Sequence, residues 1–199
     1  MVDGNLILDN TNIHYVPDSF FANNNEIRSI KITNINDGVV FGSRAFYNCD
    51  SLESINFVGI KEIGKSCFMD CSLLSSLSIQ NISTISESAF ENCSELSNVS
   101  ISSEIITIKT SAFANCTNLN PITIPESVEN IESGAFNGCN SELVINVIGK
   151  ASEKDFANGW NNNGNVDLEV NFSEVDEDDN VNQEGPGSGS YDDEDNLGV

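Results

Sequence analysis

One phrase built around a phenylalanine recurs at a nearly constant interval through the middle of the chain. In each copy a small residue precedes the ring and a cysteine follows it by three positions, as in Ala89-Phe90-Glu91-Asn92-Cys93. Five copies lie 22, 22, 23 and 23 residues apart, at Phe46, Phe68, Phe90, Phe113 and Phe136. A fixed period of this length is typical of repeat proteins, because one short unit cannot enclose a core and must stack on its neighbours.

Apolar residues recur in register with the rings. They stand eight and five residues before the last four phenylalanines, and three, six and eight residues after the first four ladder cysteines; in one copy they are Ile82, Ile85, Leu96, Val99 and Ile101. The Leu-x-x-Ile-x-Ile stretch alternates at its end, which predicts a short strand with one buried face. The Ile-x-x-Ile pair predicts an extended or turning segment that returns the chain.

The phrase around each ring predicts one short helical turn, because small or capping residues precede it at Ser43, Thr110 and Ser133. The predicted fold class is therefore an α/β repeat solenoid, a right-handed coil with short parallel strands on one face and short helical turns or loops on the other. Stacking would align five rings and five cysteines in structural ladders: Phe46, Phe68, Phe90, Phe113, Phe136, Cys49, Cys71, Cys93, Cys116 and Cys139.

The residue before each cysteine predicts a further ladder. Asn48, Asn92 and Asn115 occupy this position, where an amide can bond the backbone of its own or the next coil. Asp70 can do this in part, whereas Gly138 cannot. We therefore expect the last full coil to fray first.

Weaker copies extend the pattern in both directions. Phe21 begins an earlier copy with Asn24 in the place of the cysteine, and a small bulging loop is expected at Asn36-Asp37-Gly38. A further strand is expected at Leu143, Ile145 and Val147. The predicted organisation is a solenoid of about six coils of 22–25 residues over 1–148, a C-terminal cap over 149–173 with a short helix around Ser152–Trp160, and an acidic disordered tail over 174–199.

Charge and composition exclude several classes of function. The chain has 8 Lys and Arg against 31 Asp and Glu, a net charge of −23, which argues against nucleic acid as a partner. No apolar run approaches the roughly 18 residues that span a bilayer, so we expect no direct membrane insertion. The N-terminus shows no basic flank followed by an apolar stretch, so no signal peptide is expected. A single histidine, His14, leaves little material for catalysis.

The six cysteines predict buried, reduced thiols, because evenly spaced residues along a rod do not converge on one metal ion. Cys67 and Cys71 are close in sequence and leave a metal or redox role as an alternative. A calcium loop at Asp176–Val181 is not expected, because Val181 stands where that loop needs glycine. No enzyme activity, metal or other cofactor is expected. N-glycosylation sequons, relevant only on a secretory route, occur at Asn81, Asn92, Asn98, Asn115 and Asn171.

Small polar residues alternate with the inward aliphatic residues of the expected strands and would form a flat outer lane. We name this set the candidate binding face: Ser29, Lys31, Ser54, Asn56, Ser76, Ser78, Asn98, Ser100 and Thr123. Pro121 lies in the same lane. The lane is explained either by solubility or by docking of a protein or glycan ligand, since solenoids present extended surfaces. Without aromatic or arginine anchors in the central coils, affinity per coil would be low and contact multivalent.

The repeated phrase resembles the BspA-type leucine-rich repeats of bacterial and protozoan surface antigens. Residues Ile108 to Pro125 follow their consensus, and the resemblance covers about residues 5–148. It implies a parallel-stranded solenoid without catalytic residues, and a recognition or adhesion module at the cell surface or outside the cell. An intracellular scaffold or adaptor of the same fold, located in the cytoplasm, is the alternative, favoured by reduced cysteines and the missing leader. A metal-dependent or redox protein would require reactive thiols at Cys67 and Cys71.

Overall fold

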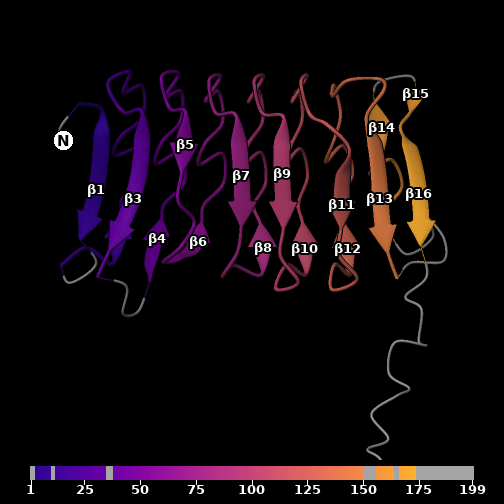
Figure 1. Ribbon diagram of the computed structural model, residues 1–199, viewed down its shortest axis with the longest axis horizontal. Coiled ribbons are helices and arrows are strands. Elements are labelled where there is room, and N and C mark those ends of the chain that lie inside the picture. Colours follow the sequence, from indigo (N-terminus) through magenta and orange to yellow (C-terminus); the bar gives the residue numbers. More distant parts are fainter. Residues whose placement is uncertain (1–2, 10–11, 35–37, 150–155, 164–165, 174–199) are drawn as a thin grey trace, which may run out of the picture.

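The computed structural model describes residues 3–9, 12–34, 38–149, 156–163 and 166–173. One side of the molecule is a row of parallel strands that stand side by side along the long axis (Figure 1). The first five form one sheet: β1 (Asn5–Asp9), β3 (Ser29–Thr33), β5 (Ser54–Ile55), β7 (Ser76–Ile79) and β9 (Asn98–Ile101). The next three form a second sheet: β11 (Ile122–Ile124), β13 (Val144–Ile148) and β16 (Glu169–Ser173).

The Ile-x-x-Ile segments form strands of their own and pair in parallel from coil to coil. One sheet contains β2 (Tyr15–Val16), β4 (Val39–Phe41) and β6 (Ile60–Ile63), and the other contains β8 (Thr84–Ile85), β10 (Thr107–Ile108) and β12 (Asn130–Ile131). Near the C-terminal end, β14 (Asn162–Asn163) and β15 (Val166–Asp167) form an antiparallel pair. Each central coil therefore has two strand sides joined by turns, and its aliphatic residues point between them into the core.

The predicted helical turns are wrong, since the described residues contain no helix. In the coil at Phe46, the Tyr47 N–H donates to the Arg44 carbonyl at 3.0 Å, but the Phe46 N–H donates to the Cys67 carbonyl of the next coil at 2.9 Å. Arg44 and Asn48 also have φ values of 55° and 54°. A helix needs a run of negative φ and bonds within the segment. The phrase instead forms successive turns bonded to the next coil.

The segment that follows Val147 adds a parallel strand, because β16 pairs with β13 through Ile145 opposite Val170. Of the helix expected around Ser152–Trp160, residues 152–155 lie outside the described residues, and the rest is not helical but has a turn at residues 158–160. The expected loop at residues 36 and 37, the tail over 174–199 and the calcium-type sequence within it also lie outside the described residues.

A column of stacked rings forms the centre of the core. Consecutive rings from Phe21 to Phe136 lie 5.2 to 5.6 Å apart, with planes within 12° of parallel. From Phe46 onward the ring residues are fully buried, and each such side chain contributes roughly 1.5–3 kcal/mol of burial free energy. Trp160 meets Phe136 at 6.4 Å with its plane turned by 75°. The column therefore ends on a ring that lies edge-on.

The residues before the cysteines bond along the column through their side chains rather than to the backbone. The Asn92 amide donates to Asp70 Oδ1 at 2.6 Å, and the Asn115 amide donates to Asn92 Oδ1 at 2.8 Å. Their backbone N–H groups already donate to the next coil, and their φ values are 62° and 59°. Asn, Asp and Gly tolerate this left-handed conformation best. Gly138, with φ of 74°, also adopts this conformation but has no side-chain amide to extend the row of hydrogen bonds.

Candidate binding face

Parallel pairing aligns the polar residues of the strands into columns. Ser29 is opposite Ser54, Ser54 is opposite Ser76, and Ser76 is opposite Asn98. Ser78 and Ser100 are partners in a second column. Since neighbouring strands lie about 4.8 Å apart, hydroxyl and amide groups repeat at that interval along the solenoid. All nine residues of the candidate binding face are exposed except Ser29, which is half-buried and donates to Asn5 Oδ1 at 2.6 Å.

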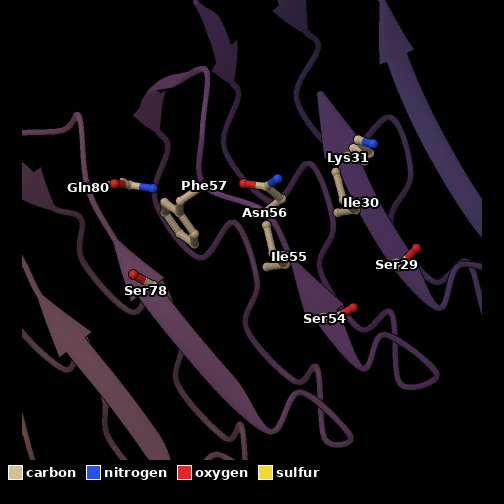
Figure 2. A pocket seen from close by; sticks show the side chains of 9 residues that line it. All are labelled: Ser29, Ile30, Lys31, Ser54, Ile55, Asn56, Phe57, Ser78 and Gln80. Carbon is tan, nitrogen blue, oxygen red and sulfur yellow. The ribbon is translucent and has the colours of Figure 1, made fainter. Parts of the chain in front are cut away.

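Two recesses hollow this face, which is therefore not flat. The first recess has a volume of about 420 Å³ and crosses β3, β5 and β7, with polar groups around an apolar floor (Figure 2). Its lining residues are Ser29, Ile30, Lys31, Ser54, Ile55, Asn56, Phe57, Ser78 and Gln80. The small serine side chains leave the space that larger residues would fill.

The second recess, of about 380 Å³, continues toward β9. It shares three residues with the first, and its full lining is Ser54, Ile55, Ser76, Leu77, Ser78, Asn98, Val99, Ser100 and Pro121. The two recesses together include eight of the nine predicted face residues. Thr123 lies on β11 in the other sheet and lines neither.

A proline marks the place where the strand row is interrupted. Pro121 occupies the repeat position of Asn98, whose N–H donates to the Ser75 carbonyl at 3.4 Å. Proline has no N–H to give, and β9 and β11 belong to separate sheets. Val99 is half-buried beside this gap, whereas Leu77, its equivalent on β7, is only 5% exposed. Sequence reasoning placed Pro121 in the lane but missed the break, although a proline inside a strand pattern signals one.

The charge around the recesses differs from that of the chain as a whole. Neither lining contains an Asp or Glu, and the single charged side chain is Lys31. The nearby Glu53 pairs with Arg28 at 2.9 Å on the surface. In a protein of net charge −23, this face is therefore open to a neutral or acidic partner without direct repulsion from its own lining.

The six cysteines are buried as free thiols. Each of the five ladder thiols donates to the carbonyl of the phenylalanine one coil earlier, as Cys93 Sγ does to Phe68 at 3.3 Å. Burial raises the thiol pKa values, to about 11 for Cys49 and about 12 for Cys139. Burial also raises the pKa values of Cys67 and Cys71. A nucleophilic or redox thiol needs an accessible thiolate, which these environments disfavour.

Among the residues that the structure describes, no three His, Cys, Asp or Glu side chains are grouped to hold a metal ion. In the same part of the chain, no helix has the length and hydropathy needed to cross a membrane. Of the sequon asparagines, Asn92 is half-buried and the other four are exposed. Asn92 and Asn115 belong to the row of side-chain hydrogen bonds before the cysteines, and Asn171 donates to Asn146 Oδ1 at 3.3 Å.

Turns of this kind, each contributing a Leu-x-x-Ile-x-Ile strand to a parallel row, define a leucine-rich repeat protein. The family model described as the BspA type leucine rich repeat region matches residues 14–143 in six copies. The chain belongs to this BspA-type leucine-rich repeat family. The repeats of this family and fold are typically non-catalytic and serve binding or recognition.

A solved structure supports this assignment of the fold. A leucine rich cell surface protein from Faecalibacterium prausnitzii is similar at 25% sequence identity with a TM-score of 0.51, over 67% of this chain and 42% of that one. A leucine-rich repeat protein from Eubacterium ventriosum is similar at 25% identity with a TM-score of 0.43, over 63% of this chain and 43% of that one. This chain thus spans less than half the length of either. No curated protein matches it.

Proposed function

We propose that the chain is a non-enzymatic recognition and adhesion module that binds a protein or glycan ligand through the candidate binding face. The observation that carries this proposal is the pair of adjoining recesses, which a strongly acidic chain keeps free of carboxylates. Hydroxyl and amide groups at the rim supply hydrogen bonds, and Ile30, Ile55 and Leu77 supply an apolar floor. This combination suits an uncharged or mildly acidic surface.

Binding spreads over several coils in this proposal. Neither lining contains the Trp, Tyr or Arg residues that dominate strong binding sites, and Phe57 is only 2% exposed. Because the polar columns repeat from strand to strand, an extended ligand contacts several coils at once. Affinity then comes from the sum of weak contacts held in register.

Display at a cell surface is part of the same proposal. Two observations support it. The chain belongs to the BspA-type repeat family, whose repeats occur in surface antigens, and it is similar to the Faecalibacterium prausnitzii cell surface protein. That protein is longer, and the match covers 42% of it.

The test replaces three central face residues by lysine, in the variant S54K, S76K and N98K. Its matched control carries S103K, T117K and N130K, three exposed positions outside both recess linings with the same change in charge. Labelled wild-type protein is screened on a glycan array and on an array of surface proteins. Binding that the face variant loses and the control keeps supports the proposal. Ligands bound equally by all three proteins contradict it.

An intracellular adaptor of the same fold is the second candidate, and the six free, buried thiols favour it because they suit a reducing compartment. Protease treatment of intact cells of the native source separates the two locations. Digestion of the protein on whole cells supports surface display. Protection until the cells are lysed supports the adaptor.

A further inference from the structure

A third recess lies on the other strand side of the solenoid, formed by the Ile-x-x-Ile segments. It has a volume of about 240 Å³ and is lined by Lys61, Glu62, Ile82, Ser83, Thr84, Ser86 and Lys109. We call it the lysine recess. It shares no lining residue with the two recesses of the candidate binding face.

The lysine recess opens where this strand side is interrupted. β8 and β10 are paired, and the Lys109 N–H donates to the Ile85 carbonyl at 2.9 Å. β6 and β8, one coil earlier, belong to separate sheets. Across this gap the Ser86 hydroxyl donates to the Ile63 carbonyl at 2.7 Å. The looser junction leaves room between the coils, bordered by the side chains of Ser83 and Thr84.

The charge in this recess runs against that of the chain. Two exposed lysines, Lys61 and Lys109, come from coils on either side of the serines, against one acid, Glu62. Within the described residues, the ion pairs of the molecule join Arg28 to Glu53 and Lys65 to Glu87, and neither involves these two lysines. Glu132 lies within the electrostatic reach of Lys109, but its carboxylate accepts two hydrogen bonds from Thr110.

We propose that the lysine recess binds a tetrahedral oxyanion, a sulfate or phosphate group, independently of the candidate binding face. The two ammonium groups supply charge and rotatable donors, and the Ser83 and Thr84 hydroxyls supply neutral donors. Since a water occupies about 30 Å³, the recess holds such a group with several waters. The net charge of −23 opposes long polyanions, so a single anionic group is the fitting ligand.

The first test is a nuclear magnetic resonance titration of the full chain at low ionic strength, where screening is weakest. Sodium sulfate and sodium phosphate are added in separate series, with sodium chloride at matched ionic strength as reference. The expected result is a saturable shift of the Ser83, Thr84 and Lys109 amides with at least one oxyanion, and the two series show which group is preferred. Shifts that chloride reproduces, or that spread over all lysines without saturating, overturn the proposal.

Charge variants make the test specific. K61Q and K109Q should each weaken binding roughly twofold to fivefold, the range for one exposed ion pair. E62Q should tighten it, because the substitution removes the one carboxylate in the lining. K65Q is the matched control, since Lys65 pairs with Glu87 outside the recess and its loss should leave the titration nearly unchanged. A double K61Q and K109Q variant that titrates like the wild type refutes the site and leaves the binding-face proposal untouched.

Discussion

Each coil has two strand sides and a turn side, which is the segment from the phenylalanine to the cysteine. Contacts from coil to coil are unbroken only on the turn side. Its rings stack without a gap from Phe21 to Phe136, and its thiols donate across every junction from Cys49 to Cys139. The strand sides are interrupted, once at Pro121 and once between β6 and β8. The comparison indicates that these rings and thiols, which we call the turn column, hold the coils together. Recesses can therefore form on the strand sides without loss of the stack.

The largest expected effect on the turn column comes from alkaline pH. Burial raises the pKa values of Cys67, Cys93 and Cys116 above the ordinary value of 9.0, so the folded state holds their protons while the unfolded chain releases them. Stability from these thiols is complete below about pH 9 and is lost as pH rises above it. Each fully buried thiol contributes a slope of up to about 1.4 kcal/mol per pH unit.

The measurement is urea unfolding between pH 7 and 10.5. Above about pH 9, the free energy of unfolding of a C93V variant should fall less steeply with pH than that of the wild type, by up to about 1.4 kcal/mol per pH unit. If the free energy of unfolding changes equally with pH in the variant and the wild type, then burial does not raise the pKa of the Cys93 thiol.

Removing one ring from the column is expected to cost nearly as much. Phe90 stacks on Phe68 and Phe113 at 5.6 Å and is fully buried, so F90A should lower the free energy of unfolding by about 3–5 kcal/mol. I106A is the matched control on a strand side, where Ile106 is 37% exposed, and should cost less than about 1 kcal/mol. Urea denaturation measures both. Equal losses would contradict the view that the column dominates.

The last full coil tests whether the amide ladder contributes to the column. A Cβ at Gly138 would lie 1.9 Å from Asn115 Oδ1, and its φ is 74°. G138A should therefore destabilise the protein by about 1–2 kcal/mol, the cost of a left-handed alanine. G138N should cost less, because asparagine tolerates this φ and can join the ladder. Amide hydrogen exchange should also be faster around Gly138 than around Asn92, and the reverse order would refute the expected fraying.

The smallest effect is expected where the strand row is already broken. P121S restores an N–H for the junction between β9 and β11, a gain of about 0.5–1.5 kcal/mol. The substitution also raises the conformational entropy of the unfolded chain, which lowers the free energy of unfolding by about 0.4–1 kcal/mol. Thermal unfolding should therefore change little, while exchange of the β9 amides should slow. A large loss of stability would mean that the proline itself supports the fold.

The sequence predicts the turn column and the row of strands well, because the period and the apolar positions encode them directly. Ile122 and Ile124 are fully buried and Thr123 between them is exposed, as alternation requires. The helical turns were predicted wrongly, since nothing local reveals that Arg44 adopts a positive φ and that the Phe46 amide bonds the next coil. Asn, Asp and Gly before the cysteines were the available signal of a left-handed position.

The recesses are less accessible to sequence reasoning. Pro121 predicts the break between β9 and β11. No residue of β6 or β8 predicts the break between those two strands, which depends on how their coils pack against each other. The face residues could be named from alternation alone. Whether their small side chains enclose a hollow depends on the floor that Ile55 and Phe57 provide from below.

The perpendicular contact between Phe136 and Trp160 bears on how this architecture can change length. A ring that lies flat on its neighbour presents the same surface above and below, so one more copy of the unit can be inserted anywhere in the pile. An edge-on ring presents a different surface and offers no seat for another flat one. Duplication or loss of one coil is thus compatible with the stacked part of the solenoid, whereas the segment that contains Trp160 must be kept as a unit.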